Sequence, residues 1–226
     1  MKSLKESIFK ESIFKESIFK ESIFKESIFS DVEDIVNSDS ALIEQFLKDN
    51  YEIRGTYVIK NGVVDVKGYI TVKNENIKSF TNDIFTFGVV TRGFYCYNCF
   101  NLKSLEGAPK EVNGDFYCVN CSKLTSLEGA PEEVKGIFNC SECSNLVSLK
   151  GAPKKVGWDF RSTGCPKLAS LEGAPKEVGG EFYCGDCPRL KTLKGAPEKI
   201  WGYLRCKTCK NLKITDQDRK KYKISY

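Results

Sequence analysis

The chain has 226 residues, with 35 lysine and arginine residues against 30 aspartate and glutamate residues, which gives a net charge of +5. This mild excess is spread along the chain and does not form the basic stripe of a nucleic-acid-binding protein, so we expect no nucleic-acid partner. The chain contains no histidine, the commonest general base and a common metal ligand, so we predict that it is not an enzyme and needs no cofactor.

Three features predict the compartment. No apolar run approaches the about 20 residues that a membrane span needs, so we expect no membrane contact. The first residues, MKSLKESIF, lack the apolar segment of a secretion signal. The 11 cysteines are an odd number, and without export they are expected to stay reduced. We therefore predict a cytoplasmic protein.

Residues 1–30 form a low-complexity tail in which KESIF occurs five times in tandem, from Lys5 to Phe29. A five-residue period places the Ile-Phe pairs all round a helix and on alternating faces of a strand, so neither structure buries them together. Three interpretations stay open: a mobile segment or helix of uncertain order, a repeated docking peptide that gains avidity from its copies, and self-association through exposed Ile and Phe.

Residues 31–50 are predicted to form an N-terminal capping helix. The stretch SDSALIEQFLKDNY offers Ser or Asp as the N-cap, and Leu42, Ile43, Phe46 and Leu47 follow on one helical face. We expect this apolar face to cover the first coil of the array that follows. The alternative is an amphipathic helix that binds a partner.

Residues 51–93 are predicted to form degenerate, shortened leading coils. The segments IRGTYVIKN, which begins at Ile53, and VKGYITVKN, which begins at Val66, share one pattern at an offset of 13 residues. NIKSF at Asn76 then matches NLKSL at Asn101. Atypical units are expected at the end of a stacked array, because its terminal apolar face must be covered.

Residues 94–214 carry a strict repeat of 22 residues, in which phenylalanine, leucine, glycine, proline and cysteine columns keep step. The second cysteine of each pair falls at Cys99, Cys121, Cys143, Cys165, Cys187 and Cys209. The alternation Phe-x-Cys predicts one short strand per unit, and Gly-Ala-Pro then turns the chain. Phe116 and Cys118 are expected to point inward, and Asp115 and Tyr117 outward.

The unit resembles the leucine-rich repeat, whose pattern is L-x-x-L-x-L-x-x-N/C-x-L. Phe182 and Cys184 stand at the inward strand positions, Cys187 at the Asn/Cys position and Leu190 at a following leucine. Over residues 51–214 the chain is similar to bacterial and bacteriophage arrays of the type nLtSLeGaPkeVgG-F-C, although its strand uses Phe and Cys where the family prefers Leu. The resemblance implies a mostly β, leucine-rich-repeat-like solenoid with one short strand per 22-residue coil and short capping helices at both ends.

The paired cysteines admit several interpretations. Core packing is favoured because the pairs recur at the structural period and because Ser162 replaces the first cysteine of one pair. A four-cysteine zinc site is the minority alternative, since repeated CxxC pairs are typical of such sites. Dithiol redox chemistry and disulfides between coils also stay open.

The outward strand residues vary while the frame of each unit is fixed, which indicates a binding surface. Tyr and Arg are enriched at binding hot spots. We therefore predict that a protein partner contacts Tyr95, Tyr97, Tyr117, Arg161, Tyr183, Tyr203 and Arg205. The alternative is that tyrosine favours strands and stacks along a sheet for structural reasons alone. The Lys and Glu residues around each Pro are predicted to form a solvated face.

Residues 215–226 are predicted to form a C-terminal cap, since Thr215 and Asp218 resemble a capping box at the start of a short basic helix.

The pattern as a whole favours a non-enzymatic protein-binding repeat module, and the resemblance implies a bacteriophage-encoded protein in the host cytosol. The alternative is a structural or virion-assembly component that docks through the KESIF tail.

Overall fold

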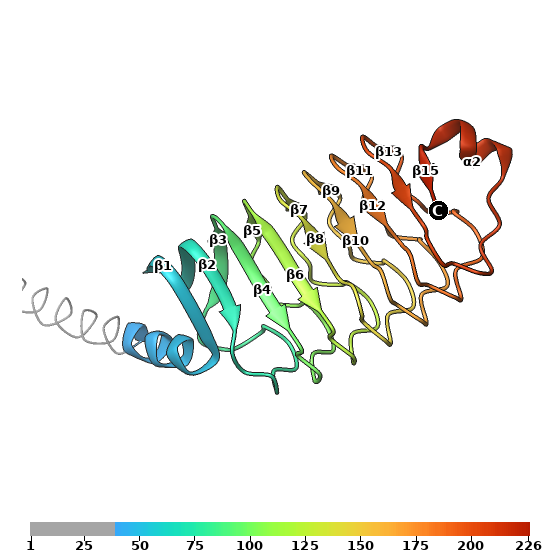
Figure 1. Cartoon of the computed structure of the whole chain (residues 1–226). Coiled ribbons are helices and arrows are strands. Elements are labelled where there is room, and N and C mark those ends of the chain that lie inside the picture. Colours follow the sequence, from blue (N-terminus) through green and yellow to red (C-terminus); the bar gives the residue numbers. More distant parts are fainter. Residues whose placement is uncertain (1–38) are drawn as a thin grey trace, which may run out of the picture. The chain divides into compact units, whose positions relative to one another are not determined.

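The structure, a computed structural model, describes residues 39–226 (Figure 1). Residues Gln45–Tyr226 form one compact unit, in which parallel strands of successive coils pair at a register of 22 residues, as in Phe160↔Phe182. The mostly β solenoid predicted from the repeat is confirmed. The KESIF repeats and Ser38, the first of the candidate N-cap residues, lie outside the described residues.

Each coil passes once through the sheet, as predicted, but its strand path is bent into two short segments. The odd-numbered segments pair with one another: β3 (Thr86–Val90), β5 (Glu111–Val112), β7 (Glu133–Val134), β9 (Lys155–Val156), β11 (Glu177–Val178) and β13 (Lys199–Ile200). The even-numbered segments form a second ladder: β4 (Gly93–Tyr97), β6 (Asp115–Val119), β8 (Phe138–Asn139), β10 (Phe160–Arg161), β12 (Phe182–Tyr183) and β14 (Leu204–Arg205). Val112 and Phe116 are both fully buried on either side of the bend, so the apolar pattern did not reveal it.

The first strands form a hairpin, which corrects the sequence interpretation. β1 (Tyr51–Lys60) and β2 (Val63–Val72) pair antiparallel through a loop at Asn61 and Gly62. The prediction that both segments are stacked coils is therefore wrong for β1. Their shared pattern reflects an antiparallel register in which Gly55 faces Gly68, and Asn-Gly is the favoured sequence of a two-residue hairpin loop.

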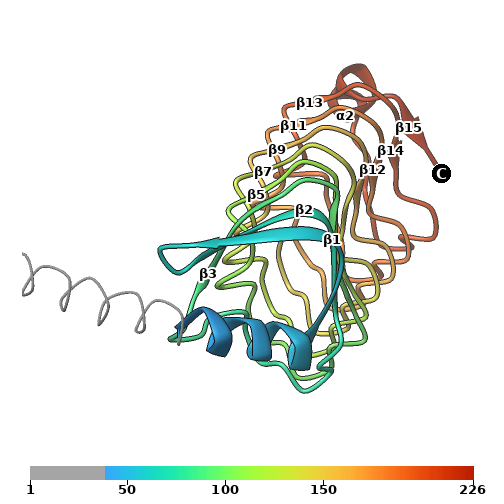
Figure 2. The ribbon, with the colours of Figure 1, turned by 90° about the vertical axis from the view of Figure 1, so that its left-hand side faces the viewer.

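β2 is the strand from which the solenoid starts. Its first half pairs parallel with β3, and its second half, Tyr69–Thr71, pairs parallel with β4. Figure 2 shows β1 and β2 crossing in front of both ladders, with the odd-numbered segments on the left and the even-numbered segments on the right. One continuous strand therefore fixes the register of both ladders.

Inward residues form columns along the stack, and these columns are the core. The rings of neighbouring coils in the phenylalanine column stack with centroids 5.1–5.4 Å apart. This column comprises Phe94, Phe116, Phe138, Phe160 and Phe182, each 0% exposed. Leucine and cysteine columns are buried in the same way, because a single coil cannot bury its own apolar face.

A helix over residues 39–50 precedes β1. The Phe46 ring contacts Phe85 at 5.7 Å and Tyr51 at 6.5 Å between centroids, and Leu47 is buried. These contacts cover the first coil, as expected. Leu42 is 59% exposed, so the prediction that it shares the buried face is wrong.

The C-terminal end is closed by a helix and a strand. α2 (Asp216–Lys221) begins with the predicted capping box, in which Thr215 and Asp218 each accept a bond from the other's backbone N–H. The hydroxyl of Tyr222 donates to the Pro197 carbonyl at 2.8 Å. β15 (Ile224–Ser225), which the sequence did not indicate, then pairs parallel with β14.

Candidate partner-binding face

Alternation along the even-numbered strands turns Phe and Cys inward and the residues between them outward. Parallel pairing in register then aligns these outward residues: Tyr95 lies beside Tyr117, and Arg161 lies beside Tyr183. Arg205 follows Tyr183 on β14. These five predicted residues share one row across the sheet, which we call the outer row.

The other two predicted residues flank the outer row. Tyr97 ends β4 and is 42% exposed, and Tyr203 directly precedes β14 and is 46% exposed. The outer row is interrupted on β8, where Asn139 takes the equivalent position. The structure therefore places six of the seven predicted residues in two groups. Tyr203 adjoins the second group through Arg205, whose guanidinium lies 5.3 Å from the Tyr203 ring centroid.

The first group, the tyrosine group, consists of Tyr69, Tyr95, Tyr97 and Tyr117. The Tyr95 ring is central, with centroid distances of 5.9 Å to Tyr69, 6.1 Å to Tyr97 and 5.3 Å to Tyr117. The guanidinium of Arg92 lies over the Tyr69 ring at 5.7 Å. Neighbouring rings thus pack against each other, and all four residues remain partly exposed.

Tyr69 is a member of this group that sequence reasoning missed. It pairs with Gly93, where the absent side chain leaves space for the Tyr95 ring, because a Cβ there would lie 2.5 Å from the Tyr95 hydroxyl oxygen. The segment VKGYITV could have revealed this residue, because Ile70 aligns with the inward Phe94 and the adjacent Tyr69 then faces outward. The hairpin had to be recognised before that alignment placed Tyr69 on the outer face.

Burial and a neighbouring carboxylate keep the hydroxyls of Tyr95 and Tyr117 protonated. Desolvation, supported by the negative charge of Asp115, raises the pKa of Tyr95 to about 12 and also raises the pKa of Tyr117. Asp115 is itself fixed, since its carboxylate accepts the Ile137 N–H at 2.8 Å. Neutral phenols both donate and accept hydrogen bonds, so Tyr95 and Tyr117 offer polar aromatic contacts without a charge of their own.

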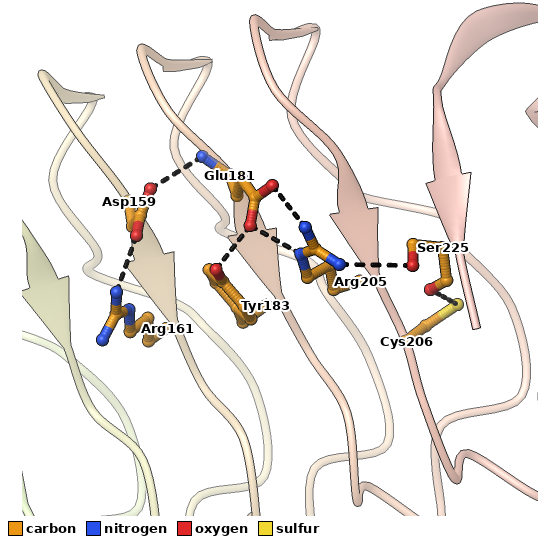
Figure 3. Close-up of polar contacts among 7 residues, drawn as sticks. All are labelled: Asp159, Arg161, Glu181, Tyr183, Arg205, Cys206 and Ser225. Carbon is orange, nitrogen blue, oxygen red and sulfur yellow. Dashed lines mark hydrogen bonds and ion pairs between the residues drawn. The ribbon is translucent and has the colours of Figure 1, made fainter.

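The second group, the arginine group, consists of Asp159, Arg161, Glu181, Tyr183 and Arg205 (Figure 3). Arg205 makes a bidentate ion pair with Glu181, with N–O distances of 2.5 and 2.7 Å. Arg161 pairs with Asp159 at 2.8 Å. Tyr183 donates its hydroxyl proton to Glu181 and lies under the guanidinium of Arg161, 5.1 Å from the ring centroid.

These contacts fix the arginine side chains without covering them. The side chains of Arg161 and Arg205 remain 37% and 39% exposed. Hydrogen bonds from Arg205 and Tyr183 lower the pKa of Glu181, although burial opposes the shift, so this carboxylate stays ionised. Each arginine is compensated by one carboxylate, and the group is a pre-ordered surface of near-zero charge.

Asp159 and Glu181 are also absent from the predicted site. The sequence placed them on the sheet surface, in the column before the inward Phe, but gave no reason to include them. The usable signal is the spacing: each acid stands two residues before Arg161 or Tyr183, and side chains at i and i+2 share one face of a strand.

The Lys and Glu residues around each Pro form a solvated face, as predicted. Lys154 pairs with Glu132 at 3.0 Å, and both side chains are more than 70% exposed. Lys150 pairs with Glu128 of the neighbouring coil at 2.9 Å. Exposed pairs of this kind contribute little to stability.

All eleven cysteines are buried free thiols. The second thiol of a pair donates to a carbonyl of the preceding coil, as from Cys143 to Cys118 at 3.2 Å and from Cys187 to Ser162 at 3.3 Å. Ser162 fits its column because its hydroxyl donates to the Tyr183 carbonyl at 3.1 Å. Within residues 39–226, no cluster of three or more His, Cys, Asp or Glu side chains is arranged to hold a metal ion.

Iodoacetamide is expected to modify Cys209 before the cysteines of the middle coils. A hydrogen bond from Cys187 lowers the pKa of Cys209 to about 7, whereas desolvation raises the pKa of Cys118 and of Cys140 well above the usual value. Because the thiolate is the nucleophile, the rate at Cys209 should rise between about pH 6 and pH 8 and then level off.

Peptide mass spectrometry after timed labelling measures this rate. Cys206 is the internal control, because desolvation raises its pKa to about 11 in the same coil. Equal rates at Cys206 and Cys209 across this pH range would contradict the prediction.

No protein-family model matches the chain, and no curated protein or solved structure does. Among the helices of residues 39–226, none has the length and apolar character needed to cross a membrane.

Proposed function

We propose that the protein is a non-enzymatic binding module that recognises a protein partner through the outer row and its two flanking tyrosines. One observation carries the proposal: tyrosine and arginine side chains are held in register on a rigid sheet while remaining partly exposed. Residues of these types dominate the energetics of protein interfaces when their geometry is fixed beforehand.

The arrangement favours a protein partner over a nucleic acid. A phosphate backbone is bound through uncompensated positive charge. In the arginine group, Arg161 and Arg205 are already paired with Asp159 and Glu181. Such a surface suits a partner that offers aromatic, aliphatic and hydrogen-bonding groups of both polarities.

The resemblance to bacteriophage and bacterial arrays supports placing this module in the cytosol of a bacterial host. The five identical KESIF copies favour a second candidate function, a structural or virion-assembly component that docks through the tail. Several weak copies of one docking peptide raise the overall avidity without any new contact.

Affinity capture from host lysate with full-length baits separates the two functions. The face variant changes Tyr95, Tyr117, Arg161 and Tyr183 to Ser, and the tail variant changes every Ile and Phe of the KESIF copies to Ser. The matched control changes Lys110, Glu132, Lys154 and Lys176 of the solvated face to Ser. Each hot-spot residue is expected to contribute about tenfold or more to the affinity.

The binding module is supported if one partner is captured by the wild type, the control and the tail variant but not by the face variant. A partner that only the tail variant loses rules out recognition by the outer row and supports the docking tail. Circular dichroism of each bait shows whether a loss of binding is a loss of fold.

A further inference from the structure

β1 has one open edge. Among the strands of residues 39–226 it pairs only with β2, so its other edge has no neighbouring strand. Gly55 and Thr56 at its centre are exposed, and Val58 is 64% exposed. The pairing with β2 is continuous from Tyr51 to Lys60, without a bulge, and β1 contains no proline. A long, regular edge strand is a template for another strand unless something protects it.

The hairpin loop determines which backbone groups point to this edge. In a two-residue hairpin the pair that closes the loop is hydrogen-bonded, and here that pair is Lys60↔Val63. Bonded and non-bonded pairs alternate along an antiparallel ladder. The odd-numbered residues of β1, such as Ile53, Gly55 and Ile59, therefore direct their N–H and C=O groups to the open edge.

This parity restricts how β1 can pair with itself about a two-fold axis. Only odd-numbered residues can form hydrogen bonds across the open edge, so each odd-numbered residue must face an odd-numbered residue of the other copy. The two residue numbers of every facing pair then add up to an even number. The two-fold axis therefore passes through a residue and not between two residues. Centred on Arg54, the pairing sets Arg54 opposite itself, and centred on Tyr57 it sets Arg54 opposite Lys60. Like charges directly opposite each other are destabilising. Centred on Gly55, the pairing sets no charged residues of β1 opposite each other.

Only the pairing centred on Thr56 joins nine residues and sets opposite charges against each other. On the outer face, Glu52 meets Lys60 twice, and Thr56 meets its own copy. On the inner face, Ile53 meets Ile59 twice, and both are half-buried in the single chain, so pairing covers more of their apolar surface. Opposite charges, Thr–Thr pairs and apolar pairs all stabilise antiparallel strands.

We propose that β1 pairs antiparallel with β1 of a second copy of this chain, about a two-fold axis through Thr56. The contact is isologous and closes after two copies, so it satisfies the edge without producing a fibre. The two sheets become one, and a two-fold axis perpendicular to the sheet leaves both outer faces on the same side. The surface is distinct from the outer row, and the inference does not rest on the proposed function.

Sedimentation equilibrium of the full chain over a concentration series tests this dimer. The wild type is expected to dimerise reversibly. Glu52→Lys and Lys60→Glu each turn two opposite-charge pairs into like-charge pairs, so each should raise the dissociation constant at least about tenfold. In an equimolar mixture of the two variants, position 52 of each copy again carries the charge opposite to that of position 60 of its partner, so a heterodimer of near wild-type affinity is expected.

The matched control is Lys103→Glu, which makes the same change in net charge as Lys60→Glu at an exposed position outside β1. It should leave the dissociation constant unchanged, and native mass spectrometry of the mixture should show the heterodimer as the main dimeric species. A wild type that stays monomeric overturns the proposal. A dimer whose dissociation constant neither charge reversal changes also overturns it. The same holds if both reversals weaken the dimer and mixing the two variants does not restore the affinity.

Discussion

Phe138→Ala is expected to lower the free energy of unfolding by about 3–5 kcal/mol, the range for deleting a buried phenylalanine. Phe138 is 0% exposed and stacks on both neighbours of its column, with ring centroids 5.3 Å from Phe116 and 5.4 Å from Phe160. The substitution removes both stacks. The rings on either side cannot close the gap, because strand pairing fixes the spacing of the coils.

The position of Phe138 gives this loss a second consequence. In a solenoid each coil contacts only its neighbours, so stability is close to a sum of coil terms and interface terms. Phe138 contributes to two interfaces in the middle of the array, and weakening both should uncouple the two halves. We expect a lower urea midpoint and a broader transition by circular dichroism.

Phe100→Ala is the matched control. Phe100 is 45% exposed, so the same chemical change removes only about half as much buried area and leaves the stacked column intact, and we expect a loss of less than about 1.5 kcal/mol. Similar losses for both variants would show that the stacked column does not carry the stability assigned to it.

The inward half of this fold could be predicted from sequence because it obeys one rule repeated in every coil. Phe116 and Cys118 were expected inward and are fully buried, and Asp115 and Tyr117 were expected outward and are partly exposed. Period-2 alternation and a fixed repeat suffice for that result. Neither requires knowledge of how the chain bends between Val112 and Phe116.

The N-terminal hairpin could not be predicted in the same way because two rules competed. The segments around Gly55 and Gly68 look like successive repeats, yet the Asn61–Gly62 loop makes them antiparallel partners. β1 therefore runs opposite to the strands of the coils. Its buried Tyr51 packs on the first coil, with 5.2 Å between the ring centroids of Tyr51 and Phe87. Local turn chemistry decided the topology, and the repeat pattern was misleading where the repeat begins.

The candidate site shows the same limit at the level of side chains. Sequence alternation placed Arg161 and Arg205 on the outer face correctly. It could not show that Glu181 binds Arg205 and Tyr183 together, because that depends on side-chain rotamers and on the distance between neighbouring strands. The carboxylates of Asp159 and Glu181 compensate the two arginines, so the composition of the outer row alone overstates its positive charge.

Gly129→Ala is expected to destabilise the protein by more than about 3 kcal/mol. Gly129 has φ +89°, and the left-handed region alone costs a residue with a Cβ about 1–2 kcal/mol. A Cβ at Gly129 would also lie 2.2 Å from the backbone nitrogen of Glu106 in the preceding coil. That backbone cannot retreat easily, because the adjacent Leu105 N–H donates to the Glu128 carbonyl at 2.9 Å. The strain and the clash therefore add.

Gly164→Asn is the matched control, because Gly164 is also left-handed, at φ +70°, but a Cβ there would make only ordinary van der Waals contacts, the nearest at 3.6 Å. Equivalent positions hold Asn98 and Asn120 at φ +57° and +55°, so we expect a change within about 0.5 kcal/mol, measured by urea unfolding as for Gly129→Ala. The repeat therefore keeps glycine where the preceding coil occupies the space of a Cβ, and admits other residues where it does not. Equal losses at both positions would mean that backbone conformation alone, and not the contact between coils, keeps glycine in the Gly129 column.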